Sequence, residues 1–507
     1  ANMAAESAIS ALIERLANIS VDSKTEALEE LKTAVAVLPS SELRAILPNI
    51  SITTVFQCLN TQNKAQQKVC CEVLDRMLST LSASAALQNF YSHFLTWITV
   101  QDDSLKALCL HQLSRISKEA PHELGQHEEL VLAIVDQLAS DDLGVGIAAA
   151  TVLTNLGRDP SGLVALFTEP VVNKIVQVMQ KNEITKFRVY QIATDLSVVS
   201  PQALEATVQS GLLRQLLNET QQRDILVQLN AIELVSDLAR SPHGLAFLDR
   251  EGVVKRLEDM LTHLNDNTLS GLLLPGLIKF FGGLARNHPK EVLSRFDHFI
   301  RVVLNNVSEG DLNIRGVSVE TVGFIASTPE GKLALDRIGN PVTECIHSIG
   351  NIIKTGPVEL KARALQAMTE TVNLQLENQT DELLCLTERW FSSSMSDPFK
   401  TVWSIAQQPF SDIRLPAMHL LQSLALTPWG QKLMNTAPGF KEYVLDRATE
   451  QIKEGKNEKF ELVKILTHSS TAVEILGRPY HVKLLEYFNQ GPFYVLAQSE
   501  VAMEGDA

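Results

Sequence analysis

Leu238-Ala239-Arg240-Ser241-Pro242-His243-Gly244 is one copy of a short motif that recurs along the chain. Two further clear copies are Ile325-Ala326-Ser327-Thr328-Pro329-Glu330-Gly331 and Leu424-Ala425-Leu426-Thr427-Pro428-Trp429-Gly430. Each copy begins with the last apolar residue of a predicted helix, which serves as an anchor for measuring the repeat. The seven anchors are Ile116, Leu156, Leu196, Leu238, Leu284, Ile325 and Leu424. Neighbouring anchors lie 40, 40, 42, 46 and 41 residues apart, and the last interval of 99 residues spans two repeats with one degenerate copy between them.

This period decides the predicted fold. A spacing of about 40–47 residues is typical of HEAT and armadillo repeats, in which each repeat packs only on its neighbours. The helix that ends on each anchor carries apolar residues at i, i+3, i+4 and i+7, as in Ala231, Leu234, Val235 and Leu238. Such a stripe buries one helix face and exposes the other. We therefore predict an all-α, armadillo/HEAT-like helical-repeat solenoid, wound as a right-handed superhelix with a concave groove.

The regularity of the repeat varies along the chain. We predict a single solenoid over residues 3–490, with atypical N-terminal repeats at 7–100, regular repeats of about 41 residues at 101–338, an irregular repeat at 339–407 and C-terminal repeats at 408–490. In the irregular part, Thr355-Gly356-Pro357 and Asp397-Pro398 interrupt the helices. Residues 491–507 are acidic and are predicted to form a disordered tail.

Composition restricts the classes of partner and the compartment. The net charge of −15, from 44 basic against 59 acidic residues, disfavours nucleic acid and is compatible with a basic protein partner. The six cysteines show no CxxC spacing, which indicates reduced and mostly buried thiols. No signal peptide is apparent, and the longest apolar stretch, from Leu272 to Ala285, is too short to span a bilayer. We expect a soluble protein without a membrane partner, located in the cytoplasm and with the nucleus open as a second compartment.

Sequence motifs for catalysis, metals or cofactors are missing. The chain has no phosphate loop, no dinucleotide fingerprint, no HExxH and no GxSxG elbow. The cluster around His122 and His127 is interpreted as a solvated turn. Of the adjacent Cys70 and Cys71, one thiol is expected in the core and the other half-exposed. The pairs Asp102-Asp103 and Asp141-Asp142 are interpreted as helix caps. We expect no enzyme activity and no cofactor.

A candidate binding surface follows from the positions two and six residues after the start of each apolar stripe, which point away from the core at 3.6 residues per turn. Read along the central repeats, these positions are mostly polar, with acidic residues in the middle. A solvated helix face is the plain alternative for any one of these residues. Stacked repeats, however, turn equivalent positions into one continuous strip, and acidic side chains there would attract a basic protein surface. We call this candidate set the groove ladder; its members are Gln191, Asp195, Glu233, Asp237, Lys279, Glu320 and Phe324.

Two resemblances to known families extend this prediction. Gly211-Leu212-Leu213, with Leu216-Leu217 and the helix ending at Leu238, resembles the armadillo consensus. Nuclear-import armadillo proteins carry a Trp and an Asn where this chain has Glu233 and Asp237, and no copy here has that Trp, so their peptide pocket is not reproduced. The whole chain is also similar to a family of proteasome non-ATPase regulatory subunits. The stretches that carry this similarity are Phe187-Arg188-Val189-Tyr190, Lys279-Phe280-Phe281-Gly282, Gly356-Pro357-Val358-Glu359-Leu360-Lys361, Trp390-Phe391-Ser392-Ser393, Gln408-Pro409-Phe410 and Gly491-Pro492-Phe493-Tyr494-Val495.

The second resemblance implies an assembly chaperone for the base of the proteasome regulatory particle. Such a protein would bind the C-terminal domain of an ATPase-ring subunit, regulatory subunit 7, in a module with regulatory subunit 4 and non-ATPase subunit 2. While bound, it would hinder docking of the ATPase ring on the proteolytic core. The alternative is an importin- or catenin-like adaptor that binds an extended basic peptide in its groove.

Overall fold

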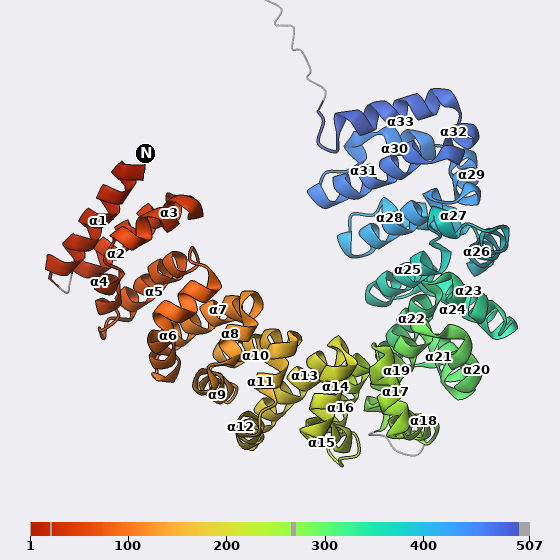
Figure 1. Cartoon of the computed structure of the whole chain (residues 1–507). Coiled ribbons are helices and arrows are strands. Elements are labelled where there is room, and N and C mark those ends of the chain that lie inside the picture. The colour runs from red at the N-terminus through yellow and green to blue at the C-terminus, as the bar shows by residue number, and fades with distance from the viewer. Residues whose placement is uncertain (1, 21–22, 265–269, 496–507) are drawn as a thin grey trace, which may run out of the picture. The chain divides into compact units, whose positions relative to one another are not determined.

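The computed structural model describes residues 2–20, 23–264 and 270–495, and over these ranges the chain forms helices and turns without a β-strand. The chain divides into two compact units, Ala1–Glu251 (unit 1) and Gly252–Ala507 (unit 2). Within each unit, successive helices stack side by side along the chain (Figure 1). The all-α, armadillo/HEAT-like solenoid predicted from the period is therefore confirmed.

The helices of unit 1 are α1 (Asn2–Asn18), α2 (Lys24–Val37), α3 (Ser40–Ile46), the 3₁₀ turn η2 (Leu47–Asn49), α4 (Ile52–Gln57), α5 (Lys64–Leu78), α6 (Ala83–Thr99), α7 (Asp103–Glu119), α8 (Pro121–Gly125), α9 (Glu128–Gln137), α10 (Leu143–Arg158), α11 (Pro160–Leu166), α12 (Glu169–Met179), α13 (Glu183–Val199), α14 (Pro201–Gln209), α15 (Leu212–Glu219), α16 (Ile225–Leu238) and α17 (Pro242–Arg250).

The helices of unit 2 are α18 (Val253–Thr262), η4 (Ser270–Leu272), α19 (Leu274–Asn287), α20 (Pro289–Arg295), α21 (Asp297–Glu309), α22 (Leu312–Ala326), α23 (Pro329–Asp336), α24 (Asn340–Thr355), α25 (Val358–Val372), η5 (Leu376–Asn378), α26 (Asp381–Ser394), α27 (Pro398–Ala406), α28 (Ser411–Ala425), α29 (Pro428–Thr436), α30 (Phe440–Leu445), η6 (Arg447–Thr449), α31 (Lys453–His468), α32 (Ser470–Leu476) and α33 (Arg478–Gln490).

Each regular repeat consists of a short helix that begins at proline, a second helix, and a long core helix that ends near the anchor. Proline has no N–H to donate and a fixed φ, so it suits the first turn of a helix. Helices α17, α23 and α29 begin at Pro242, Pro329 and Pro428, as the motif predicts. The second helices α15 and α18 follow Gly211 and Gly252, whose φ angles of 81° and 70° lie in the left-handed region that glycine tolerates.

The constant spacing inside the copies of the motif has a steric cause. The hydroxyl before the proline caps the short helix: Thr328 Oγ1 accepts a hydrogen bond from the Gly331 N–H at 3.0 Å. The glycine then lies against the end of the preceding core helix. A Cβ atom at Gly331 would stand only 1.8 Å from the Ile325 carbonyl oxygen, and one at Gly430 only 2.0 Å from that of Leu424. The motif therefore marks a joint at which the backbone of the short helix contacts the end of the preceding core helix.

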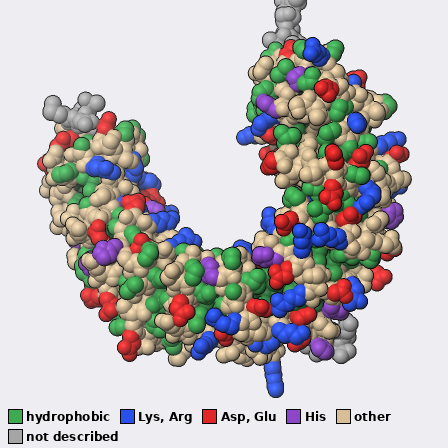
Figure 2. Space-filling view, turned by 45° about the vertical axis from the view of Figure 1, so that its right-hand side comes forward, with side chains coloured by type: hydrophobic (Ala, Val, Ile, Leu, Met, Phe, Trp, Pro, Cys, Tyr) green, Lys and Arg blue, Asp and Glu red, His purple; other side chains and the backbone are tan. Residues whose placement is uncertain are grey.

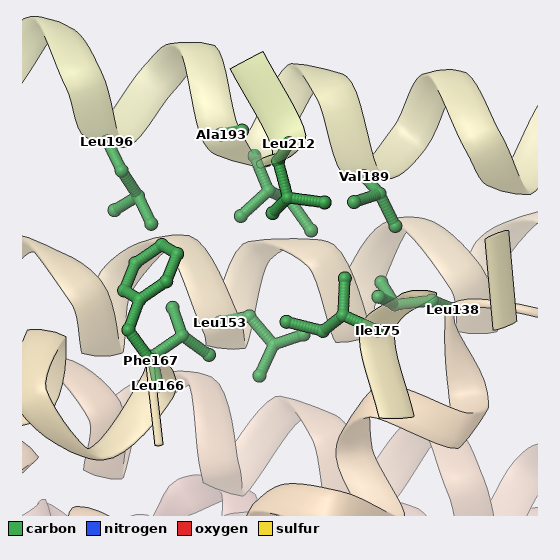
Figure 3. A pocket seen from close by; sticks show the side chains of 10 residues that line it. Leu138, Leu153, Leu166, Phe167, Ile175, Val189, Ala193, Leu196 and Leu212 are labelled. Carbon is green, nitrogen blue, oxygen red and sulfur yellow. The ribbon is translucent and has the colours of Figure 1, made fainter. Parts of the chain in front are cut away.

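The anchors and their stripes form the core. All seven anchors are buried, and in α16 the four stripe residues from Ala231 to Leu238 are buried as predicted. Figure 3 shows side chains of the α10–α13 region, among them Leu153, Val189 and Leu196, turned toward one another. The space left between them is about 10 Å³, no more than about one water molecule can occupy, so the repeats join through a filled hydrocarbon core.

The predicted irregular stretch departs from the pattern in the manner its sequence suggests. Thr371 is buried at the place of the missing anchor, and its hydroxyl donates to the Ala367 carbonyl oxygen at 2.7 Å. No proline-started short helix follows; the chain passes through η5 into the longer helix α26. Asp397, just before α27, has a φ of 49°, which is unusual for a residue other than glycine.

The predicted limits of the solenoid, residues 3–490, and the bounds of its sub-ranges stay predictions. Of the predicted tail, residues 496–507 lie outside the described residues.

Over the residues that are described, no single helix has the length and apolar character needed to cross a membrane. The bent pair α11 and α12 has that length and composition when the two helices are taken together.

Candidate functional site

The core helices of each unit place the groove ladder on neighbouring elements. In unit 1, α7, α10, α13 and α16 pack one against the next, and in unit 2 the same holds for α19, α22, α25 and α28. Each core helix buries the face that ends at its anchor, so the opposite face is left for solvent or a partner. The two units carry different chemistry on this face.

In unit 1 the groove ladder is acidic. Gln191 and Glu233 are exposed, whereas Asp195 and Asp237 are half-buried. Gln191 Nε2 donates to Asp195 Oδ1 at 2.8 Å, and Asp237 forms an ion pair with Arg240 at 2.8 Å. Partial burial raises the pKa of the Asp195 carboxyl. The hydrogen bond from Gln191 lowers this pKa, and the nearby charge of Asp237 raises it, but burial is the largest effect. A cation brought by a partner would relieve this repulsion between carboxylates.

In unit 2 the groove ladder is mixed in charge and partly aromatic. Lys279, Glu320 and Phe324 are exposed. The Arg286 guanidinium lies 4.4 Å from the centre of the Phe324 ring, and Glu320 is 3.5 Å from the Arg363 guanidinium. Arg286, Glu320 and Phe324, with side chains of α25, line a hollow of about 250 Å³, whereas Lys279 does not reach it. The exposed Phe324 ring with its stacked arginine has the composition of a protein-contact site, since arginine and aromatic residues are enriched there.

Some residues six positions after the start of the apolar stripe are more covered than the helical period suggests. Asn155 in α10 and Ser423 in α28 hold this position, which the helical period places away from the core, yet they are 7% and 6% exposed. Asn155 Nδ2 reaches Ser114 Oγ of the preceding core helix at 3.4 Å. Arg115 likewise donates to the Leu81 carbonyl oxygen at 2.9 Å. Asn155 and Arg115 thus bridge adjacent repeats, and periodicity within one helix overestimates their exposure.

A larger hollow lies on the same face of unit 1. It measures about 570 Å³ and lies between α7 and α10. Ala107, Gly144 and Ala148 leave it open because their side chains are small, and His111 and Thr151 line it. His111 Nδ1 is 2.6 Å from Asp75 Oδ1. Figure 2 shows Lys and Arg side chains mixed with Asp and Glu over the visible surface.

The other sequence candidates are structural. Within the described ranges, no group of His, Cys, Asp or Glu side chains could hold a metal ion. His127 stacks on Tyr91 with ring centres 4.5 Å apart, and Glu123 accepts a hydrogen bond from Ser84 at 2.5 Å. Asp102 and Asp142 accept hydrogen bonds from the N–H groups of Leu105 and Val145 at 2.9 and 2.8 Å, so the helix-cap interpretation is confirmed for both.

The prediction for the adjacent cysteines was wrong for Cys71. Both thiols are buried, Cys70 at 0% and Cys71 at 7% exposure, because α5 lies between α2 and α7. Burial raises the pKa of both thiols, that of Cys71 to about 12, with the charges of Asp102, Asp75 and Glu72 adding to the effect. The reactive thiolate is therefore scarce at neutral pH.

Solved structures with a similar fold include yeast importin-β, with a TM-score of 0.60 and 12% sequence identity over 95% of this chain and 66% of that one. A second structure of the same yeast protein gives a TM-score of 0.55. At this level of identity the likeness concerns the helical-repeat fold alone.

Sequence relatives cover the chain from end to end. The human 26S proteasome non-ATPase regulatory subunit 5 is 35% identical over 498 residues, 98% of each chain, and the bovine protein is 35% identical over 96% of this chain and 97% of that one. The subunit of the same name from Drosophila melanogaster is 22% identical over 95% of both. The family model described as proteasome non-ATPase 26S subunit matches residues 5–507. These matches confirm the resemblance first indicated by scattered motifs: the chain belongs to the family of 26S proteasome non-ATPase regulatory subunit 5.

Proposed function

We propose that this protein is a non-enzymatic assembly chaperone for the base of the proteasome regulatory particle. It binds the C-terminal domain of an ATPase-ring subunit, regulatory subunit 7, in a module with regulatory subunit 4 and non-ATPase subunit 2. While bound, it hinders premature docking of the ATPase ring on the proteolytic core. It acts in the cytoplasm and can also act in the nucleus.

The observation that carries this proposal is the family match over the whole chain, which supports a proteasome-associated role. The fold agrees with a protein-binding role, because stacked repeats present an extended surface rather than a closed pocket. The open hollows on the core-helix faces also suit a folded partner better than a buried small ligand.

The groove ladder of unit 1 is the contact that we assign to the ATPase domain. Glu233 is exposed on α16, with Asp237 one turn further along and Asp195 on the neighbouring helix α13. A basic patch on the partner would be steered to this cluster and would lower the cost of keeping its carboxylates ionised.

A charge-reversal variant tests this assignment. The double variant Glu233→Lys/Asp237→Lys should lose regulatory subunit 7 in a pull-down while its melting temperature stays within a few degrees of the wild type, because neither side chain belongs to the core. The matched control is Glu169→Lys/Glu205→Lys, which makes the same change of charge at exposed positions of α12 and α14. Undiminished binding by the first variant would place the contact elsewhere on the protein.

The adaptor alternative makes a different prediction. An isolated basic peptide would bind as tightly as the folded ATPase domain. A clear preference for the folded domain, measured by titration of both ligands against the same protein, would favour the chaperone.

A further inference from the structure

A row of exposed apolar side chains lies at the start of successive core helices, outside the groove ladder. In unit 2 the row consists of Leu312, Val358, Phe410 and Ile452, which are 60%, 52%, 63% and 45% exposed. Leu312 and Val358 open α22 and α25, and Phe410 and Ile452 immediately precede α28 and α31. We call these four residues the edge row. Exposed apolar residues also lie in the first turn of three core helices of unit 1: Leu143 is the first residue of α10, and Ile184 and Leu226 are the second residues of α13 and α16, at 61%, 66% and 69% exposure.

Folding does not explain the edge row. Serine, threonine, aspartate and asparagine are favoured where a helix begins, since their side chains cap its free N–H groups. Phe410 and Ile452 hold these capping positions in α28 and α31 and make no side-chain cap. Each also leaves apolar surface in water, which is unfavourable. Leu312 and Val358 are instead the first residues of their helices. An exposed apolar residue at the cap or first position of each core helix from α22 to α31 points to a partner.

An exposed carboxylate accompanies each member of the edge row. Asp311 precedes Leu312, Glu359 follows Val358, and Asp412 and Glu454 lie two residues after Phe410 and Ile452. Cations also lie beside the row: Lys453 separates Ile452 from Glu454, and Glu359 forms an ion pair with Arg363 at 3.5 Å. The edge therefore presents apolar and acidic side chains side by side, which is complementary to a surface of aliphatic and basic side chains.

The spacing of the edge row suggests the shape of its occupant. The helices α22, α25, α28 and α31 pack in succession, and neighbouring packed helices lie about 8–10 Å apart. Seven residues of an α-helix rise about 10 Å, so a helix with an apolar residue at every seventh position would meet one edge-row residue in each repeat. A helix also satisfies its own backbone hydrogen bonds, whereas an extended chain would need partners for them.

We infer that the edge row of unit 2 is a docking site for an amphipathic helix of a protein partner, with aliphatic residues at heptad spacing and lysine or arginine beside them. This contact is additional to the ATPase-binding face proposed above, since it involves the ends of the core helices rather than their exposed sides. Its test uses other residues, so either proposal can fail while the other stands.

A designed peptide probes the edge row directly. A helical peptide of about 22 residues carries leucine at every seventh position and lysine on either side of each leucine, and its scrambled counterpart has the same composition. Fluorescence anisotropy against the full chain should show at least about tenfold tighter binding of the heptad peptide. Equal binding of the two peptides would overturn the inference.

A pair of variants then locates the binding. Val358→Ser/Phe410→Ser should weaken binding of the heptad peptide by about tenfold or more. Serine is a favoured capping residue, so the Phe410→Ser change should not lower the melting temperature. The control Leu376→Ser/Val482→Ser removes two apolar side chains that are 75% and 62% exposed elsewhere in unit 2, and it should bind like the wild type. Equal affinity of the edge-row variant and the wild type would contradict the assignment, as would an equal loss in the control.

Discussion

The joints between repeats and the exposed faces of the core helices follow different rules. At the joint, Gly244, Gly331 and Gly430 hold the same place, and each would collide with an anchor carbonyl oxygen if it carried a side chain. On the exposed face, equivalent positions hold residues as different as Glu233 and Lys279. Positions that hold the same residue in each repeat therefore show how the repeats are joined. At positions whose residue differs between repeats, a partner can distinguish one repeat from another. The edge row is informative because its four residues are all apolar and exposed although they do not belong to the joint.

The largest effect is expected when the joint is overfilled. Gly331→Ala would place a methyl group 1.8 Å from the Ile325 carbonyl oxygen, so the two helix backbones must move apart. We expect a loss of about 1–3 kcal/mol in the free energy of unfolding, measured by urea denaturation followed by circular dichroism.

The matched control for this change is Gly283→Ala on α19, where an added Cβ meets no atom within 4 Å. Alanine stabilises a helix interior relative to glycine by about 0.5–1 kcal/mol, so this variant should be as stable as the wild type or more so. Similar losses in both variants would show that the joint is not the cause.

Two copies of the joint differ in a buried polar residue, and this difference predicts a dependence on pH. Gln431 Nε2 donates to the Ala425 carbonyl oxygen at 2.8 Å, and Lys332 Nζ, at the equivalent place, donates to the carbonyl oxygens of Ala326 and Glu370. Burial lowers the pKa of Lys332 to about 7, with the charge of Glu370 acting weakly against it. The unfolded chain keeps the ordinary lysine pKa of about 10.4.

Between about pH 7 and pH 10 the unfolded chain therefore binds the Lys332 proton more tightly than the folded protein does, and stability rises with pH. The Lys332→Gln variant lacks the titrating amine and therefore lacks this rise of stability with pH. Its stability relative to the wild type should be greatest near pH 7 and should fall by up to about 1.4 kcal/mol per pH unit toward pH 10. A difference that does not change with pH, in urea titrations at a series of pH values, would show that Lys332 keeps its proton in the folded protein.

The smallest effect concerns the cap of the motif. Thr427 Oγ1 accepts the Gly430 N–H at 3.2 Å and donates to the Leu424 carbonyl oxygen at 3.0 Å. Thr427→Ala should cost about 1 kcal/mol in the free energy of unfolding, and Thr427→Ser, which keeps the cap, should cost less. If serine did not rescue the loss in thermal or urea melts, packing of the threonine methyl group would be its cause.

The sequence predicted those features that depend on one helix at a time. The proline starts, the buried anchors and the caps at Asp102 and Asp142 are local, and each was correct. Features that depend on two repeats were missed. The burial of Asn155 and Cys71 arises from neighbouring helices that one helix's periodicity does not include. The stacking of Arg286 on Phe324 joins α19 to α22, so spacing along either helix could not reveal it.

The groove ladder itself stays a prediction, because exposure shows which side chains a partner can reach and not which it binds. The edge row could have been found from the sequence, since an apolar residue with a carboxylate one or two positions away stands at the start of each core helix from α22 to α31. The helical period assigned those residues no role, and only their exposure in the structure distinguishes them from the core.

The central claim, an assembly chaperone that binds the ATPase ring before the mature particle forms, is tested most directly by isolating the tagged full-length chain from cells and identifying its partners by mass spectrometry. The account predicts regulatory subunit 7, with regulatory subunit 4 and non-ATPase subunit 2, and depletion of these partners by Glu233→Lys/Asp237→Lys. It also predicts that subunits of the proteolytic core are absent from the isolated complex. Recovery of the complete proteasome, or of none of the three regulatory subunits, would contradict it.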